Sequence, residues 1–424
     1  CPLVLGLGEG ENFLASDIPA LLPYTRRIVP LEENEIAAID PSGVRIFDRK
    51  LNPRSRRPLE IKWNAETAAK DGYPHFMAQE IAVQGDSVEA EIEAWDRGVQ
   101  NVAIPRDVDR VAVVGCGTAW HAGLVAKVAL EELAGIPVDV GFASEVRYGD
   151  HPFGKRTLTL AISQSGETAD TLASVRAARE AGSTVLALTN TQGSTLAREA
   201  DQVICMHSGP EVGVAATKTY TSQLVNILFL ALHLGRARGT LSQERLDELV
   251  REARKLPAQA RKILRQDTLI RNCARKFQEG YGFMFIGRRY NLPTAYEGAL
   301  KMKEITYFPA EAYGAGEMKH GPLALVDHRM VCVAVAPRGR ATEKMVSNIE
   351  EVRARGGHII SVATEGDRAV AGVSDQVFEI PACEEMFSPI LAVLPLQLLA
   401  YHRAVGLDRD VDRPRNLAKS VTVE

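Results

Sequence analysis

The sequence repeats itself once, and this internal duplication limits the folds that it can adopt. Two glycines and one Asp-Gln-Val segment recur at offsets of 172 to 174 residues; the pairs are Gly115 with Gly287, Gly166 with Gly339, and residues 201–203 with 375–377. In both copies short apolar runs alternate with helical stretches. This rhythm predicts an α/β fold in which each copy forms a parallel sheet with helices on both faces. Ligands are then expected at the carboxyl ends of the strands.

The expected elements follow the duplication. The first copy should contain strands at 110–115, 158–162, 184–188 and 201–204 and helices at 118–133 and 169–181. The second should contain strands at 282–287, 330–336, 358–362 and 375–378 and a helix at 347–354. Upstream, the pattern predicts strands at 2–6, 27–31, 36–39 and 44–47, a helix at 18–24, a polar linker at 48–64 and a helical stretch at 78–94. We therefore divide the chain into an N-terminal β segment (1–52), a linker with leading helices (53–100), two α/β units (101–245 and 246–410) and a tail (411–424).

The composition is that of a globular protein, and it gives no reason to expect a nucleic-acid or membrane partner. Of the 424 residues 46% are apolar, and the formal net charge is −4. No stretch reaches the ~18 apolar residues of a membrane-spanning helix, and no signal segment is expected. The six cysteines lie far apart and lack the spacing of a zinc site, which predicts reduced thiols and a cytoplasmic location.

The segment from Ser163 to Thr168 predicts a phosphate site. It lies where an apolar strand passes into a helix, and it reads Ser-Gln-Ser-Gly-Glu-Thr. Such a turn directs unpaired backbone N–H groups and the positive end of the helix dipole at one point. Because the turn has no lysine, we expect the phosphate of a small metabolite rather than ATP; an ordinary polar N-cap is the alternative. The second copy has Ala-Pro-Arg-Gly at 336–339, so only the first copy is expected to bind phosphate.

Three ionisable residues, Glu297, Lys301 and Glu304, are spaced to lie on one face of a helix. Two carboxylates around one ammonium form an acid–base cluster if that face lines a pocket. If it does not, the same spacing describes a solvated, salt-bridged surface.

Two other segments carry candidate catalytic side chains. Residues 313–322 are rich in glycine and contain His320, which is typical of a mobile catalytic loop, although a single loop histidine can also be inert. In the tail, Lys419 could form a Schiff base with a carbonyl substrate if the segment is partly buried.

Six segments together resemble the glutamine–fructose-6-phosphate aminotransferase family, isomerising enzymes that make glucosamine 6-phosphate. They are residues 116–118, 163–168, 211–218, 297–304, 319–322 and 414–424. They follow the family order, and the match covers essentially the whole chain. The duplication corresponds to the family's two sugar-isomerase (SIS) subdomains. The resemblance implies a homodimer that requires no metal or organic cofactor.

The resemblance also implies roles for individual residues. The residues implied to hold the phosphate of fructose 6-phosphate are Ser163, Gln164, Ser165 and Thr168. Those implied around the sugar are Thr118, Ala119, Val214, Ala216 and Ala418.

The implied catalytic residues come from the helix, the loop and the tail. Lys419 would form an imine with C2 of the open-chain ketose. His320, reaching in from the neighbouring subunit, would help to open the sugar ring. Glu304 would move a proton between C1 and C2, with Lys301 and Glu297 tuning it, because a nearby ammonium lowers the cost of the developing charge.

The sequence also departs from the family pattern. The family begins with a glutaminase domain whose N-terminal cysteine is the nucleophile, whereas residues 1–13 resemble the late part of that domain. We therefore expect residues 1–52 to be a remnant of it and Cys1 to be an internal residue exposed by truncation. The chain alone is expected to isomerise fructose 6-phosphate or to use free ammonia, but not glutamine, which supplies ammonia in the complete enzyme. Ala119 and Ala216 stand where the family often has serine, and Pro309 stands where it often has histidine.

A second function from another class stays open. A catalytically idle SIS module could sense a sugar phosphate and regulate a partner protein. It would need the phosphate turn, but not Glu304, His320 and Lys419 together. A nucleotide-binding dehydrogenase is disfavoured because the chain lacks a glycine fingerprint with a ribose-binding acid.

Overall fold

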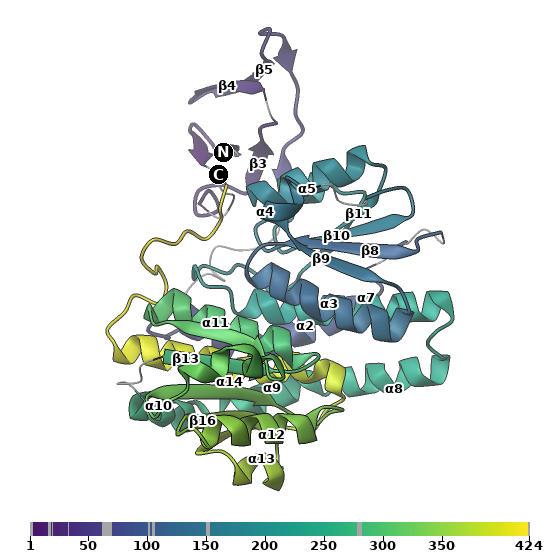
Figure 1. The fold of residues 1–424 in the computed structure, drawn as a ribbon. Helices are drawn as coiled ribbons and strands as arrows, with labels where there is room; N and C mark the ends of the chain where they lie inside the picture. Colours follow the sequence, from purple (N-terminus) through teal and green to yellow (C-terminus); the bar gives the residue numbers. More distant parts are fainter. Residues whose placement is uncertain are drawn as a thin grey trace.

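The computed structural model describes most of the chain (Figure 1). The described residues are 3–15, 18, 20–32, 34–61, 70–100, 102–103, 107–149, 153–277 and 282–422. Cys1 therefore lies outside the described residues. Within these ranges no helix combines the length and the apolar character needed to cross a bilayer.

The first α/β unit is a five-stranded parallel sheet with strand order β12-β11-β10-β8-β9. Its strands are β8 (Arg110–Gly115), β9 (Val138–Phe142), β10 (Thr157–Ser163), β11 (Thr184–Thr189) and β12 (Gln202–Cys205). Its helices are α3 (Thr118–Ala134), α4 (Ala143–Val146), α5 (Ala169–Glu180), α6 (Thr195–Glu199) and α7 (Lys218–Arg238). The central strand β10 is buried along its whole length, as its unbroken apolar run predicts.

The second unit repeats this topology. Its sheet has the order β14-β13-β15-β16-β17, which matches the first sheet when read from the opposite edge. Its strands are β13 (Gly282–Gly287), β14 (Ala310–Gly314), β15 (Met330–Ala336), β16 (His358–Thr364) and β17 (Gln376–Ile380). Its helical elements are α11 (Asn291–Thr306), η2 (Glu317–His320), η3 (Pro322–Leu325), α12 (Thr342–Arg353), α13 (Arg368–Gly372), η4 (Glu385–Phe387) and α14 (Ser388–Gly406). The predicted duplication and α/β fold are confirmed.

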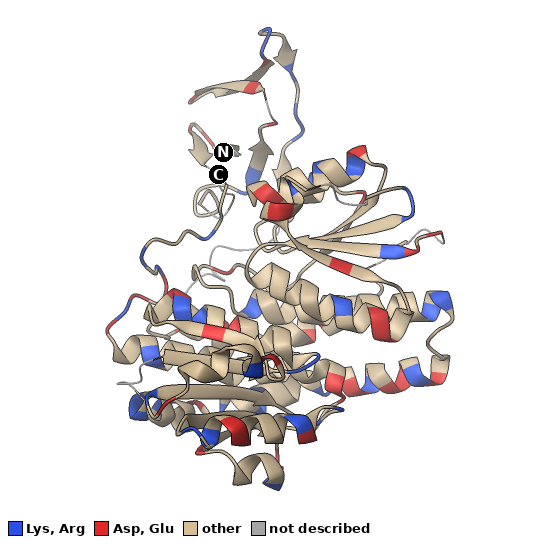
Figure 2. Ribbon diagram, in the orientation of Figure 1, with Lys and Arg blue, Asp and Glu red and all other residues tan. Residues whose placement is uncertain are grey.

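Helices join the two units through one apolar core. α8 (Gln243–Ala253), α9 (Leu256–Leu264) and α10 (Asp267–Lys276) follow the first unit, and α14 packs on α9, α10 and α11. α14 is largely apolar and almost wholly buried, as expected of a core helix. Figure 2 shows charges along outer helices such as α8, whereas the strands of both sheets are largely uncharged. One continuous cluster of buried side chains includes residues from both sheets and from α14.

The N-terminal segment forms two small antiparallel sheets beside the first unit (Figure 1). One has the order β2-β1-β3-β7, from β1 (Val4–Leu7), β2 (Asn12–Ala15), β3 (Arg27–Pro30) and β7 (Leu59–Glu60). The other has the order β4-β5-β6, from β4 (Glu35–Asp40), β5 (Gly43–Asp48) and β6 (Pro53–Arg54). Strands β6 and β7 fall in the segment expected to be a polar linker, which therefore pairs with the sheets.

Of the two helix predictions upstream of the first unit, one is wrong and the other is confirmed in a modified form. The helix predicted at 18–24 is wrong: its described residues form turns, because Pro23 has no N–H to donate to a helix. The helical stretch predicted at 78–94 is confirmed, but it forms two helices, α1 (Phe76–Ala82) and α2 (Gln84–Asp96), that meet at Val83.

The shared core predicts that the two units do not unfold independently. Leu394 in α14 is fully buried in the continuous cluster, so Leu394→Ala should cost about 2–5 kcal/mol. Hydrogen exchange should show faster amide exchange in both β10 and β15. Loss of protection confined to β15 would contradict a shared core, and the exposed Leu269 offers Leu269→Ala as a control.

Candidate active site

The turn after β10 is preformed around its own hydroxyl groups. Ser163 Oγ accepts a hydrogen bond from the Gly166 N–H at 3.0 Å and lies 3.2 Å from Thr168 Oγ1, and Ser165 Oγ accepts from the Glu167 N–H at 3.2 Å. α5 begins directly afterwards and presents its N-terminus to this turn. The predicted strand–turn–helix arrangement is confirmed.

Gly166 is required at the centre of this turn. Its φ angle is +68°, and an ideal Cβ at this position would lie 2.1 Å from Ser194 Oγ. A left-handed backbone that is packed this closely favours glycine over every other residue.

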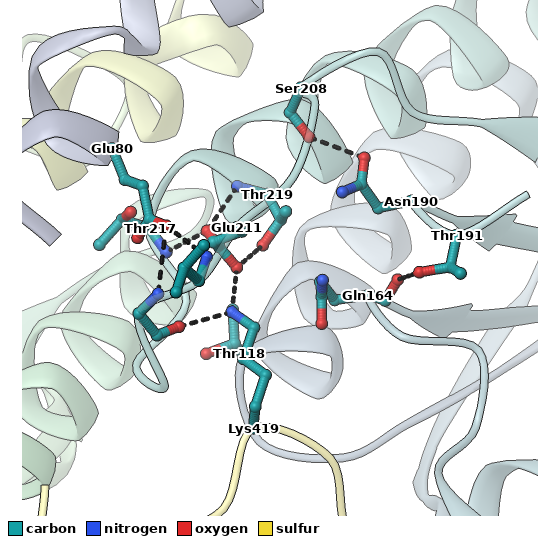
Figure 3. Close-up of polar contacts among 12 residues, drawn as sticks. Glu80, Thr118, Gln164, Asn190, Thr191, Ser208, Glu211, Thr217, Thr219 and Lys419 are labelled. Carbon is teal, nitrogen blue, oxygen red and sulfur yellow. Dashed lines mark hydrogen bonds and ion pairs between the residues drawn. The ribbon is translucent and has the colours of Figure 1, made fainter. Parts of the chain in front are cut away.

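The end of β11 supports the turn from the other side. The carbonyl oxygen of Gln164 accepts from the Asn190 N–H at 3.1 Å, and the hydroxyls of Thr189 and Thr191 lie 3.4 Å from it. In Figure 3 the side-chain amide of Gln164 projects from the turn to the side on which Thr118 and Lys419 lie. These three donors fix the backbone from which the Gln164 side chain projects.

The predicted helical face in α11 is a buried ion cluster and not a solvated surface. Lys301 Nζ lies 3.3 Å from Glu297 Oε1 and 2.5 Å from Glu304 Oε2. The Lys301 and Glu297 side chains are 1% and 0% exposed, and Glu304 is 22% exposed. Glu304 is thus the one carboxylate of the three residues that a ligand can reach.

Helix α3 of the first unit completes this cluster. Thr118 Oγ1 donates to Glu297 Oε1 at 3.0 Å, and Lys301 Nζ lies 3.3 Å from Thr118 Oγ1. His121 Nδ1 lies 2.7 Å from Glu297 Oε2. The cluster therefore joins the two α/β units at the site.

Electrostatics fix the charge state of the cluster. Burial alone would raise the pKa of Glu297, but the Lys301 ammonium, His121 and Thr118 hold it below its ordinary value. Burial alone would lower the pKa of Lys301, but the carboxylates of Glu297 and Glu304 outweigh this effect and raise it. Glu297 and Lys301 therefore stay charged in the fold.

Lys419 is held in a second cluster beside the first. Its Nζ donates to Glu211 Oε2 and to the Gly213 carbonyl oxygen, both at 2.7 Å (Figure 3). Glu211 also accepts from the N–H groups of Thr217 and Thr219 at 2.9 and 3.2 Å and from Thr219 Oγ1 at 2.8 Å. Burial would raise the pKa of Glu211, but Lys419 and these donors lower it. The Glu211 carboxylate also contributes to the raised pKa of Lys301, so the two clusters share one electrostatic environment.

Three contacts fix the tail that carries Lys419. Asp412 accepts from the N–H groups of Phe76 and Met77 at 3.0 and 2.9 Å, at the start of α1. The Arg415 N–H donates to Tyr307 OH at 2.9 Å. The Val421 carbonyl accepts from the Ala169 N–H at 3.1 Å, at the start of α5. Lys419 thus lies two residues from a direct contact with the helix that follows the phosphate turn.

Other predicted site residues lie around or away from these clusters. Val214 and Ala216 are half-buried in the loop before α7, Ala119 is buried in α3, and Ala418 is exposed in the tail. His320 is exposed at the end of η2, and among the described residues no hydrogen bond or ion pair joins it to the two clusters. The segment predicted to be a mobile glycine-rich loop forms β14, η2 and η3 instead, because Ala315 and Met318 are buried in the core of the second unit.

In the second unit, the turn that corresponds to the phosphate turn donates its backbone N–H groups to side-chain oxygens of the same unit. The Arg338 N–H donates to Thr364 Oγ1 and the Gly339 N–H to Thr342 Oγ1, both at 2.8 Å. The Arg340 N–H donates to Glu385 Oε2 at 3.4 Å. The turn of the first unit has comparable internal bonds at Gly166 and Glu167, so binding of phosphate by the first copy alone stays a prediction.

Several residues of the site were not predicted from the sequence. They are His121, Glu211, Lys218 and, behind the loop before α7, Glu80. Glu211 and Lys218 lie in a segment that resembles the family, but the Lys419 amine that contacts Glu211 comes from the tail, and no local pattern indicates this contact. Among the described residues no group of three His, Cys, Asp or Glu side chains is placed to hold a metal ion.

Comparison with known proteins identifies the domain family of the two α/β units. The SIS domain family model matches residues 106–233 and 283–406, one match for each α/β unit. The C-terminal domain of glucosamine-fructose-6-phosphate aminotransferase from Francisella tularensis superposes with a TM-score of 0.77 at 37% identity, covering 82% of this chain and all of that one. A glucosamine-6-phosphate deaminase from Thermotoga maritima shares the fold, with a TM-score of 0.68 at 24% identity over 82% of this chain and 99% of that one. The chain is therefore a protein with two SIS domains.

Relatives that are longer than this chain show to which enzyme family it belongs. The glutamine–fructose-6-phosphate aminotransferase (isomerizing) of Thermus thermophilus is 50% identical over the whole of this chain, which spans 71% of that relative. The corresponding protein of Methanosarcina mazei is 43% identical, and the chain spans 70% of it. The chain belongs to the glutamine–fructose-6-phosphate aminotransferase family, which confirms the resemblance seen in its motifs.

Gly166→Ala should weaken phosphate binding. The added Cβ conflicts with Ser194 and with the left-handed backbone, so the turn must shift, at a cost of about 1–3 kcal/mol. Calorimetry should show at least about a tenfold loss of affinity for fructose 6-phosphate. Gly182→Ala, at the other end of α5 and also at positive φ, is the matched control. Equal affinity in the two variants would refute the assignment of the turn.

Lys301→Met should destabilise the fold by about 3–5 kcal/mol near neutral pH, because it leaves the Glu297 carboxylate buried without its ammonium partner. The pKa of Glu297 is lowered in the fold, so its stabilising contribution is present above its unfolded value of about 4.3 and disappears as the pH falls through the folded value. The penalty of the substitution should therefore shrink on acidification in urea unfolding experiments. The exposed neighbour Lys303 supplies Lys303→Met as a control; a similar loss in both variants would contradict the buried pair.

Proposed function

We propose that this chain forms glucosamine 6-phosphate from fructose 6-phosphate, through an imine at Lys419 followed by ketose-to-aldose isomerisation. The observation that carries the proposal is the Val421–Ala169 backbone hydrogen bond, which brings the tail with Lys419 to the phosphate turn. A sugar phosphate held at that turn would then meet an amine and, on α11, a reachable carboxylate. The named family supports the same substrate and product.

Binding would begin at the phosphate. The hydroxyls of Ser163, Ser165 and Thr168 and the N-terminus of α5 would hold it, since such a site offers donors and a favourable dipole. The Gln164 amide would contact the same group. Thr118, Ala119, Val214, Ala216 and Ala418 would surround the sugar, as the family resemblance implies.

Imine formation requires the neutral amine of Lys419. The nitrogen lone pair adds to C2 of the open-chain ketose, and the C2 oxygen leaves as water. Glu211 and the Gly213 carbonyl orient the nitrogen before the reaction. Ammonia would then add to C2 and release Lys419, so that the nitrogen remains on the sugar.

Isomerisation moves one proton. Glu304 would take a proton from C1, the electron pair would shift toward C2, and the same carboxyl group would return a proton to C2. The C1 hydroxyl becomes an aldehyde, so the step needs no external oxidant or reductant. Lys301, paired with Glu304, would stabilise the carboxylate, and Glu297 would hold Lys301 in place.

The remaining parts of the proposal rest on the family resemblance. His320, exposed on η2, would help to open the ring in the site of a second copy of the chain, so that the protein would be a homodimer. Its location would be the cytoplasm. Residues 1–52 would correspond to the end of a glutaminase domain, 53–100 to a linker with leading helices, 101–245 and 246–410 to the SIS subdomains and 411–424 to the tail. Ammonia would come from glutamine through a glutaminase part.

Glu304→Gln should abolish the proton transfer and keep the binding site. We expect a loss of about 10²–10⁴ in kcat, measured by mass spectrometry of glucosamine 6-phosphate formed with ammonium, or of glucose 6-phosphate formed without it. Affinity for fructose 6-phosphate should stay within about threefold. Lys303→Met, on the same helix, should behave as the unsubstituted chain.

Three results would change the proposal. Full activity of the Glu304→Gln variant would remove the carboxylate from the mechanism. Product formed only with glutamine would make Cys1 a working nucleophile. Sugar-phosphate binding without any product, with ammonium or glutamine, would favour a sensor that regulates a partner.

A further inference from the structure

A buried carboxylate lies behind the loop that holds Lys419. Glu80, in α1, is 1% exposed. Its Oε1 accepts from the N–H groups of Val212 and Gly213 at 2.5 and 3.1 Å (Figure 3). A single oxygen thus fixes two consecutive peptide groups of the loop before α7.

The same loop presents the acceptors of Lys419. The Gly213 carbonyl belongs to the residue whose N–H is bound by Glu80, and it accepts from Lys419 Nζ at 2.7 Å. An ideal Cβ on Gly213 would lie 2.8 Å from Glu80 Oε2, so only glycine permits this approach without a shift. The position of the amine therefore depends on a contact between α1 and the loop.

The second oxygen of Glu80 is an unusual feature of this contact. Glu80 Oε2 is buried and has no hydrogen-bond partner among the described residues. Burial and the neighbouring Glu211 raise the pKa of Glu80 to about 7, against the opposing effects of Lys419 and the two N–H groups. Lys218 at the start of α7 is also buried nearby, and burial lowers its pKa despite Glu211 and Glu80. The charged groups that face Glu80 are thus Glu211, Lys218 and Lys419.

We infer that Glu80 is a positioning residue for Lys419: it holds the Val212–Gly213 peptides so that the amine is directed at the substrate carbonyl carbon. This inference rests on the proposed imine at Lys419. Glu80 acts through the loop and does not touch the substrate. Removing its acceptor should therefore impair imine formation while phosphate binding, which depends on β10 and α5, is retained.

The test measures imine formation directly. The 424-residue chain is incubated with fructose 6-phosphate and sodium borohydride, which adds hydride to C2 of the imine and leaves a stable secondary amine on Lys419. Peptide mass spectrometry then quantifies the adduct. Glu80→Met should lower its rate of formation by at least about tenfold, because small misplacements of a reacting group are costly. The affinity for fructose 6-phosphate in the absence of borohydride should change by less than about threefold.

Further variants separate positioning from general damage. Glu80→Gln keeps an acceptor oxygen and should restore most of the rate. Because the pKa of Glu80 is raised to about 7, we expect the unsubstituted chain to show a step near this pH in its rate of adduct formation, and Glu80→Gln should remove it. Gly213→Ala, which displaces the loop from the other side of the contact, should reproduce the selective loss. Glu91→Gln is the matched control, since Glu91 is equally buried and accepts a backbone N–H from His207 at 2.6 Å.

Each outcome decides a separate point. Adduct formation at the unsubstituted rate in both Glu80→Met and Gly213→Ala would overturn the inference and leave the imine intact. Parallel losses of adduct and of sugar-phosphate affinity in all variants, the control included, would also overturn it, because they indicate general destabilisation. No adduct on Lys419 in the unsubstituted chain would overturn the imine assignment in the proposed function, and this inference with it.

Discussion

A fully buried ammonium group sets the geometry on which the rest of the site depends. Lys301 can stay charged inside the protein only because Glu297 and Glu304 lie within ion-pairing distance of it. Glu297 in turn is held by Thr118 and His121 from α3. The two α/β units therefore cannot separate or slide without leaving charges unpaired in an apolar interior. This constraint keeps Glu304 at a fixed place on the rim of the site.

Local features of the site could be predicted from the sequence because their causes are local. The strand–turn–helix at Ser163–Thr168 follows from an apolar run, small polar residues and a glycine, and the common face of α11 follows from helical spacing. The edge strands β9 and β14 were not predicted, because each is only partly buried and lacks a continuous apolar run. The helical spacing on α11 left two alternatives, a solvated face and a buried cluster, because spacing does not reveal what packs against a helix.

Long-range contacts could not be predicted from pattern alone. Lys419 meets Glu211 across 208 residues of sequence, and Glu80 meets the 212–213 peptides across more than 130. The resemblance to the family pointed to Lys419, but neither spacing nor composition indicates which carboxylate receives its amine. Glu80 lies in a helical stretch that the sequence pattern identifies, yet its burial follows only from the packing of α1 under the loop.

The turn of the second unit that corresponds to the phosphate turn shows how the two copies of a duplicated chain can differ in function. There the backbone N–H groups of Arg338, Gly339 and Arg340 are bound by side chains of the same unit. The turn of the first unit also binds N–H groups with its own serine hydroxyls, but it alone of the two is followed by a helix whose first N–H donates to the tail, at Val421. Under the proposed function, the two copies would contribute different parts to one site. The second copy supplies α11, so one copy would provide the phosphate-binding turn and the other the acid–base helix. The duplication would then yield one composite site rather than two equivalent ones.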